Sequence, residues 1–128
     1  MEKLAYLDTH VVVWLFAGQV ERFPKRALRA IEERALWISP IIYLELQYLY
    51  ETAKLTVLPA KIIDSLKSEI GLKVCTKPFE SVSAEAAKHS WTRDPFDRII
   101  AAQASLTRAA LITKDDSIQT HYSPAFWS

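Results

Sequence analysis

Short apolar runs that alternate with helix-start signals constrain the fold of this chain more than any other feature. The runs cover residues 4–7, 36–38, 72–75 and 109–113. Their length and continuous apolar character favour strands that are buried on both faces, which is typical of parallel sheets. The alternation of such strands with helices predicts an α/β three-layer sandwich, in which helices flank a mainly parallel central sheet.

Capping residues and prolines mark where the helices between these strands begin. Asp8 or Thr9 caps a short helix that continues to Phe16, and Pro24 starts a second one. Further helices are expected at about 40–54, from Pro59 until Gly71, at 84–91 behind a Ser83 cap, and from 95 onward. A short helix after residues 114–117 and an extended piece at 124–127 complete the expected elements.

Length and composition limit the classes of protein to consider. A chain of 128 residues suits one domain, which we expect to span residues 1–128. The apolar runs are too short for a membrane span and the N-terminus lacks a secretory signal, so we expect a cytoplasmic protein. The single cysteine, Cys75, excludes an internal disulfide. A net charge of +1 means that any nucleic-acid partner must be held by a local basic patch.

Acidic side chains follow or precede the strands at positions that should meet in space. Asp8 follows the first strand, and Asp115 and Asp116 follow the fourth. Asp94 and Asp97 open the helix before that fourth strand. Glu45 lies about one and a half turns into the helix after the second strand. Parallel strands present their carboxyl ends at one edge, where ligand sites of such sheets lie, so we expect these groups to converge there.

Converging carboxylates repel one another and need a compensating charge. Each aspartate taken singly is also a plausible helix cap, and Glu45 is also a plausible ion-pair partner. Together they favour a hard divalent cation such as Mg²⁺ or Mn²⁺, which binds carboxylate oxygens and leaves positions for a phosphate. The three histidines have no zinc-ligand spacing, and two glycines cannot form a phosphate-binding loop.

Four segments in this order and spacing resemble the PIN-domain ribonucleases, most closely the VapC-type toxins of toxin-antitoxin pairs. The resemblance extends over essentially the whole chain. Its most specific part is the run Asp-Pro-Phe-Asp-Arg followed by Ile-Ile-Ala-Ala-Gln-Ala. The matching segments are 7–11, Glu45, 94–104 and 111–115. Where the family often has glycine before its last core strand, this chain has Arg108-Ala109-Ala110.

The resemblance implies a PIN-like fold and a metal-dependent endoribonuclease that hydrolyses RNA phosphodiester bonds. Its acids match Asp8, Glu45, Asp97 and Asp115, which would bind one or two Mg²⁺ or Mn²⁺ ions and carry the catalysis. The resemblance also implies a homodimer and a cognate antitoxin protein as a partner. The polar supports and outer-shell positions of the site would be Thr9, Thr113 and Asp94, and the candidates for contacts to RNA phosphates are Arg93, Arg98 and Lys114.

Two other functions stay open at this point. One is a non-catalytic module that binds RNA or protein, with its carboxylates acting only as caps. The other is a phosphoreceiver-type signalling domain, which has a similar length and an acidic Mg²⁺ pocket. A receiver needs a phosphoacceptor aspartate after its third strand, where this chain has Val74-Cys75-Thr76.

Overall fold

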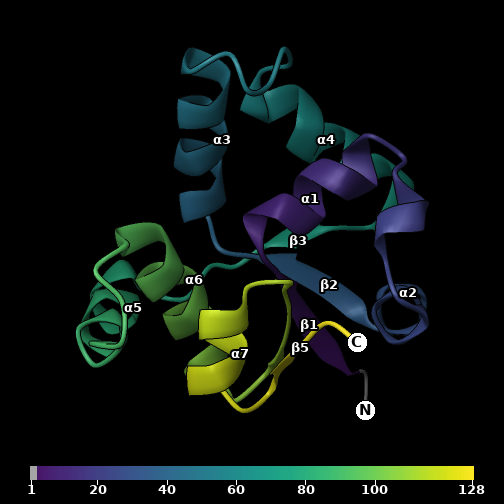
Figure 1. Cartoon of the computed structure of the whole chain (residues 1–128). Coiled ribbons are helices and arrows are strands. Elements are labelled where there is room, and N and C mark those ends of the chain that lie inside the picture. Colours follow the sequence, from purple (N-terminus) through teal and green to yellow (C-terminus); the bar gives the residue numbers. More distant parts are fainter. Residues whose placement is uncertain (1–2) are drawn as a thin grey trace.

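Five parallel strands form one sheet at the centre of the molecule (Figure 1). The structure, a computed structural model, describes residues 3–128. The strands are β1 (Leu4–Leu7), β2 (Ala35–Ile38), β3 (Lys73–Val74), β4 (Ala110–Ile112) and β5 (Ala125–Phe126). Their order is β3-β2-β1-β4-β5. The predicted α/β class with a parallel sheet is confirmed, and the order differs from the 2-1-3-4-5 order of receiver domains.

Strand β1 occupies the middle of the sheet and is buried on both faces. Tyr6 pairs with Trp37 on one side and with Leu111 on the other. Ala5, Tyr6 and Leu7 expose at most 3% of their surface, which explains why this segment is continuously apolar. Because all strands run in the same direction, the residues after β1 and β4 emerge at the same edge.

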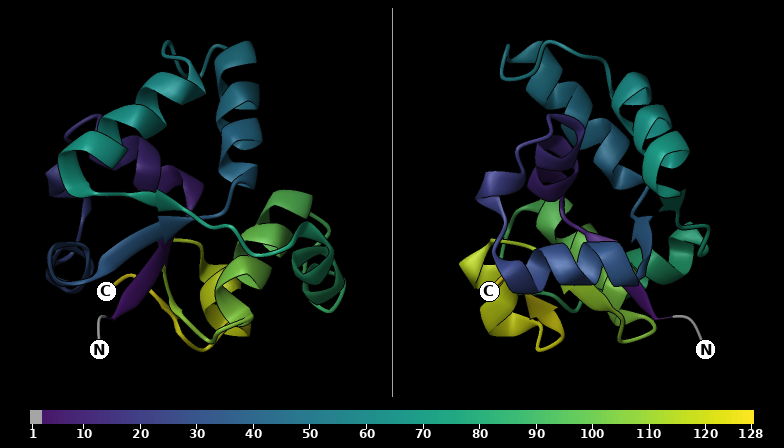
Figure 2. Two further views of the ribbon diagram at one scale, coloured as in Figure 1. Left: turned by 180° about the vertical axis from the view of Figure 1, so that it is seen from behind. Right: turned by 90° about the vertical axis from the view of Figure 1, so that its right-hand side faces the viewer.

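Helices cover both faces of the sheet. They are α1 (Thr9–Phe16), the 3₁₀ helix η1 (Val20–Arg22), α2 (Lys25–Glu33), α3 (Ile41–Glu51), α4 (Pro59–Ile70), α5 (Phe79–Ala86), α6 (Pro95–Ser105) and α7 (Asp116–His121). The chain moves outward from β1 to β3 with α1 to α4 on one side, then returns to β4 and β5 with α5 to α7 on the other (Figure 1). This division follows from right-handed crossovers, and Figure 2 shows it from behind.

Apolar side chains of the strands and of the inner helix faces form the core. Helix α6 is made of small residues on its buried side, and Ala101, Ala102 and Ala104 are fully buried there. Small side chains let this helix approach the sheet and α5 closely. Cys75 is a free, buried thiol. No helix among residues 3–128 is both long and apolar enough to cross a membrane.

Two predicted helix boundaries are wrong. The helix expected at 84–91 is α5, which begins at Phe79 directly after Pro78 and ends at Ala86. Ser83 lies inside it, because Val82 and Ala86 must be one turn apart to pack against α6. The helix expected at 40–54 ends at Glu51, since the chain reverses at Ala53, which has a left-handed backbone conformation (φ 61°).

Candidate active site

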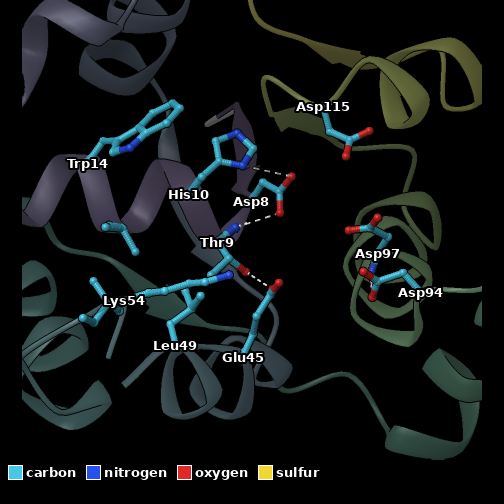
Figure 3. Close-up of a pocket in the computed structure, with 12 residues that line it drawn as sticks. Asp8, Thr9, His10, Trp14, Glu45, Leu49, Lys54, Asp94, Asp97 and Asp115 are labelled. Carbon is cyan, nitrogen blue, oxygen red and sulfur yellow. Dashed lines mark hydrogen bonds and ion pairs between the residues drawn. The ribbon is translucent and has the colours of Figure 1, made fainter. Parts of the chain in front are cut away.

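A pocket of about 420 Å³ lies at the edge of the sheet where β1 and β4 end (Figure 3). It lies between α1, α3, the start of α6 and the segment that follows β4. Five carboxylates from these distant parts of the chain line it. They are Asp8, Glu45, Asp94, Asp97 and Asp115. The convergence expected from parallel topology is therefore present for these five acids, whereas Asp116, which was expected with them, does not line the pocket.

Asp8 is the most buried of these acids, with 4% of its surface exposed. It is the N-cap of α1, and its Oδ1 accepts a hydrogen bond from the Thr9 amide at 2.7 Å. Its Oδ2 accepts from the hydroxyl of the fully buried Thr113 at 2.6 Å. A buried carboxylate needs such donors, and these two fix the orientation of the side chain.

Asp115 is held by the same hydroxyl. The amide of Asp115 donates to Thr113 Oγ1 at 3.0 Å, and its carboxylate caps α7 by accepting from the Ile118 amide at 2.9 Å. Thr113 thus connects two acids that follow different strands. The cap accounts for the course of the backbone into α7. The shared Thr113 hydroxyl fixes where Asp8 and Asp115 lie relative to each other.

Asp94 and Asp97 have different roles at the start of α6. Asp94 is the N-cap, with Oδ1 accepting from the amides of Phe96 at 2.8 Å and Asp97 at 3.3 Å. The Asp97 carboxylate caps nothing and faces the pocket (Figure 3). Burial and the charges of the other four carboxylates raise the pKa of Asp97 from 3.8 to about 7.

Glu45 reaches the pocket from α3. The hydroxyl of Thr9 donates a short hydrogen bond to Glu45 Oε1. Burial raises the pKa of Glu45 and the nearby charges of Asp8 and Asp94 raise it further, while the bond from Thr9 lowers it. The side-chain hydroxyls of Thr9 and Thr113 therefore each donate to one carboxylate of the pocket.

The carboxylates surround the pocket and do not meet at one point. Asp8 and Glu45 lie at its centre, Asp94 and Asp97 on one side, and Asp115 above them (Figure 3). Among residues 3–128, no group of three or more acidic, histidine or cysteine side chains is placed to hold a metal ion as it stands.

His10 is a pocket residue to which the sequence pattern assigned no role. Its Nε2 accepts a hydrogen bond from the Lys114 amide at 2.8 Å, so the proton of the neutral ring lies on Nδ1. Nδ1 is 3.6 Å from Asp8 Oδ2. Burial lowers the pKa of His10, against the opposing influence of Asp8 and Asp115. The place of His10 in the pocket depends on the packing of α1 beside the segment after β4, which no local sequence pattern indicates.

Trp14 and Lys54 also line the pocket without a signal in the sequence. Trp14 lies one turn beyond His10 on α1, and their ring centroids are 4.9 Å apart. Lys54 follows the reversal at Ala53 and extends along the pocket from the side opposite Asp94 and Asp97 (Figure 3). Its position depends on the turn between α3 and α4, which no motif marked.

The basic residues proposed from the sequence lie in different surroundings. Arg93 donates to the Ser90 carbonyl at 2.9 Å, and Arg98 donates through Nε to the Thr92 carbonyl at 2.8 Å. Neither lines the acidic pocket. Lys114 is exposed beside it, with its ammonium 5.8 Å from the Trp14 ring centroid. Of the three, Lys114 is adjacent to the pocket.

Comparison with protein families gives a match over most of the chain. The model of the PIN domain matches residues 5–122. Ribonuclease VapC22 of Mycobacterium tuberculosis (strain ATCC 25618 / H37Rv) is 31% identical over 121 residues, which cover 92% of this chain and 92% of that protein.

Solved structures share the fold at lower sequence identity. VapBC2 from Rickettsia felis, bound to a DNA fragment from its promoter, superposes with a TM-score of 0.66 and 16% identity, covering 98% of this chain and 97% of the other. A toxin-antitoxin complex from Klebsiella pneumoniae superposes with a TM-score of 0.65 and 18% identity, covering 95% of each chain.

Proposed function

This chain belongs to the PIN-domain family, and we propose that it is a divalent-metal-dependent endoribonuclease that hydrolyses RNA phosphodiester bonds. The 31% identity with a ribonuclease over almost the full length supports the reaction class. The pocket supports the chemistry, because it gathers acids from four separate parts of the chain. A module that only binds RNA or protein has no need for such a cluster.

The observation that carries this proposal is the gathering of five carboxylates in one pocket, where burial and the other four raise the pKa of Asp97. Its pKa of about 7 means that the carboxylate is only partly ionised at neutral pH unless a cation joins the pocket. The available donors are oxygens, which suits Mg²⁺ or Mn²⁺ and does not suit metals that prefer thiolates. The donor chemistry of the pocket therefore fits a hard cation.

We assign roles to the pocket residues from their positions. Asp8, Asp97 and Asp115 would hold the cation, and Glu45 would contribute to a second one. A cation bound there supplies a water of lowered pKa and offsets negative charge on the phosphoryl oxygens. Thr113 and Thr9 keep the carboxylates of Asp8 and Glu45 aimed at the pocket. Asp94 holds the start of α6, and with it Asp97, in place.

A toxin of a toxin-antitoxin pair is the biological role that these relatives support, with a cognate antitoxin as partner. We also propose a homodimer, because large apolar side chains remain exposed on α3 and α5. Leu44 and Tyr48 expose 43% and 49% of their surface, and Phe79 exposes 73%. Analytical ultracentrifugation of the purified chain tests the dimer, and co-purification with the product of a neighbouring gene tests the antitoxin.

Cleavage of a labelled structured RNA tests the nuclease. We expect cleavage with Mg²⁺ or Mn²⁺, none with EDTA, and a loss of more than about a hundredfold in Asp8→Asn and Asp97→Asn. Asp64→Asn on the exposed side of α4 is the control, because it makes the same chemical change outside the pocket. Cleavage in EDTA, or full activity in either pocket variant, would refute the proposal.

A further inference from the structure

The acidic pocket has a second end of opposite character. Trp14 and Lys54 line this end, and Figure 3 shows them on the side away from Asp94 and Asp97. Two more cations lie near the indole ring of Trp14. The guanidinium of Arg22 lies 5.0 Å from the ring centroid, and the ammonium of Lys114 lies 5.8 Å from it. The acidic pocket therefore has Lys54 in its lining, and two further cations, Arg22 and Lys114, lie near Trp14 at its rim.

These cations have no acidic partner to neutralise them. Among residues 3–128, no carboxylate forms an ion pair with Arg22, Lys54 or Lys114. The one side-chain hydrogen bond of Arg22 goes through Nε to Gln19 Oε1 at 2.7 Å, which leaves its two terminal nitrogens free to donate. All three cations are exposed. Free donors on fixed cations are what an anion with several oxygens can use.

Trp14 holds two of the cations at the rim of the pocket. Its indole is itself fixed by packing against His10, Phe23 and Trp127, with ring centroids 4.9 to 6.2 Å apart. A cation over an indole face gains roughly 0.5–1 kcal/mol at an exposed site, enough to bias a long side chain toward one position. The ring therefore contacts cations from two distant segments, Arg22 of η1 and Lys114 after β4.

We propose that this basic end, made of Trp14, Arg22, Lys54 and Lys114, binds the RNA backbone next to the scissile phosphate. The proposal rests on the nuclease function. It adds the path of the bound RNA, which runs from the carboxylates across Trp14 toward η1. The three cations contact successive phosphates, and Trp14 acts as a positioning residue. Net charge close to zero makes such a local patch necessary for binding a polyanion.

Binding of a short fluorescent single-stranded RNA in EDTA tests the proposal apart from cleavage. We expect Arg22→Ala combined with Lys114→Ala to weaken binding about tenfold, and to reduce the salt slope of the binding constant by about 1.4, or about 0.7 per lost phosphate contact. Lys54→Ala should reduce the slope by about half as much. Lys88→Ala, which removes one positive charge just after α5, is the control, because α5 lies on the other side of the sheet from α1.

Trp14 needs a test that separates positioning from folding. Trp14→Leu removes the aromatic face, whereas Trp14→Phe keeps one, so we expect weak binding in the first variant and near wild-type binding in the second. If Trp14→Leu proves unstable, the Arg22 and Lys114 variants decide the matter alone. The proposal is wrong if these variants bind RNA with the affinity and salt slope of the wild type. A wild type that neither binds nor cleaves RNA instead refutes the nuclease function itself.

Discussion

Two polar clusters of this molecule differ in how far their charged groups are satisfied by partners within the chain. Beside the sheet, Lys77 donates three hydrogen bonds, to Tyr6 Oη at 2.9 Å, the Gln103 carbonyl at 3.0 Å and Thr107 Oγ1 at 3.2 Å. Tyr6 in turn donates to Cys75 Sγ at 3.2 Å. The ammonium has three protons and three acceptors, so nothing remains for a ligand.

The acidic pocket lacks this internal balance. Its five carboxylates are stabilised partly by amides and hydroxyls, and the charge of Asp97 is opposed by all the others. The Lys77 cluster stabilises the fold, whereas the pocket costs stability that a bound cation would return. We infer that polar groups left uncompensated by their own chain mark the functional region.

Among changes that leave every pocket carboxylate in place, the largest effect is expected at the hydroxyl of Thr113. Thr113→Val keeps the side-chain shape and removes both the donor to Asp8 and the acceptor of the Asp115 amide. Nuclease activity should fall about 10- to 100-fold, as it does when a group that orients a metal ligand is lost. Thr113→Ser keeps the hydroxyl and should retain activity. Equal activity in the two variants would show that the hydroxyl does not orient the pocket.

Metal addition should stabilise the pocket and leave the Lys77 cluster unaffected. At a Mn²⁺ concentration a hundred times its dissociation constant, the free energy of unfolding should rise by about 2.7 kcal/mol. Most of this gain should disappear in Asp97→Asn and remain in Lys77→Met. Thermal denaturation with and without Mn²⁺ measures it. A gain that survives in Asp97→Asn would place the cation elsewhere.

Removing the Lys77 ammonium should lower the stability of the fold and leave the nuclease activity unchanged. Lys77→Met removes the ammonium and leaves the Tyr6 hydroxyl and the Gln103 carbonyl without their donor, at a cost of about 2 kcal/mol. Activity per folded molecule should not change. Urea denaturation measures the stability, with the exposed Lys67→Met on α4 as control. If activity falls and stability does not, the two clusters are coupled and the contrast between them fails.

The smallest effect is a pH dependence of the protein in EDTA. The pKa of Asp97 is raised in the folded state, so folding favours its protonated form. The stabilising proton is fully bound below pH 4, and stability falls as the pH rises from about 4 to about 7. Partial exposure reduces this contribution to the order of 1 kcal/mol.

Asp97→Asn isolates this contribution from other titrating groups. The variant should gain stability relative to the wild type as the pH rises through this window, in urea denaturation at several pH values. A difference between variant and wild type that stays constant from pH 4 to pH 8 would mean that Asp97 ionises freely in the folded protein.

The sequence predicted those parts of the pocket that depend on local signals and on chain direction. Asp8, Asp94 and Asp115 are recognisable because each caps a helix, and a parallel sheet brings the ends of β1 and β4 together. Asp97 follows one turn after its cap. These features need no knowledge of side-chain packing.

The remaining features depend on packing between elements far apart in the chain. Lys54 enters the pocket because Ala53 reverses the chain after α3, and His10 because the Lys114 amide comes to lie beside it. The start of α5 is set by contact with α6, which outweighs the capping preference of Ser83. Hydrogen bonds such as that between Lys77 and Tyr6 join residues 71 positions apart, beyond any local pattern.

The hydrogen bond between Thr113 and Asp8 joins residues 105 positions apart, and β1 gains its second neighbour only when β4 arrives. During synthesis, Asp8 therefore leaves the ribosome long before the residues that orient it. A nascent chain that ends before Ala110 has β1 unpaired on one edge and lacks both Thr113 and one of the five pocket carboxylates. Translation itself thus delays assembly of the pocket until the segment after β4 has been made.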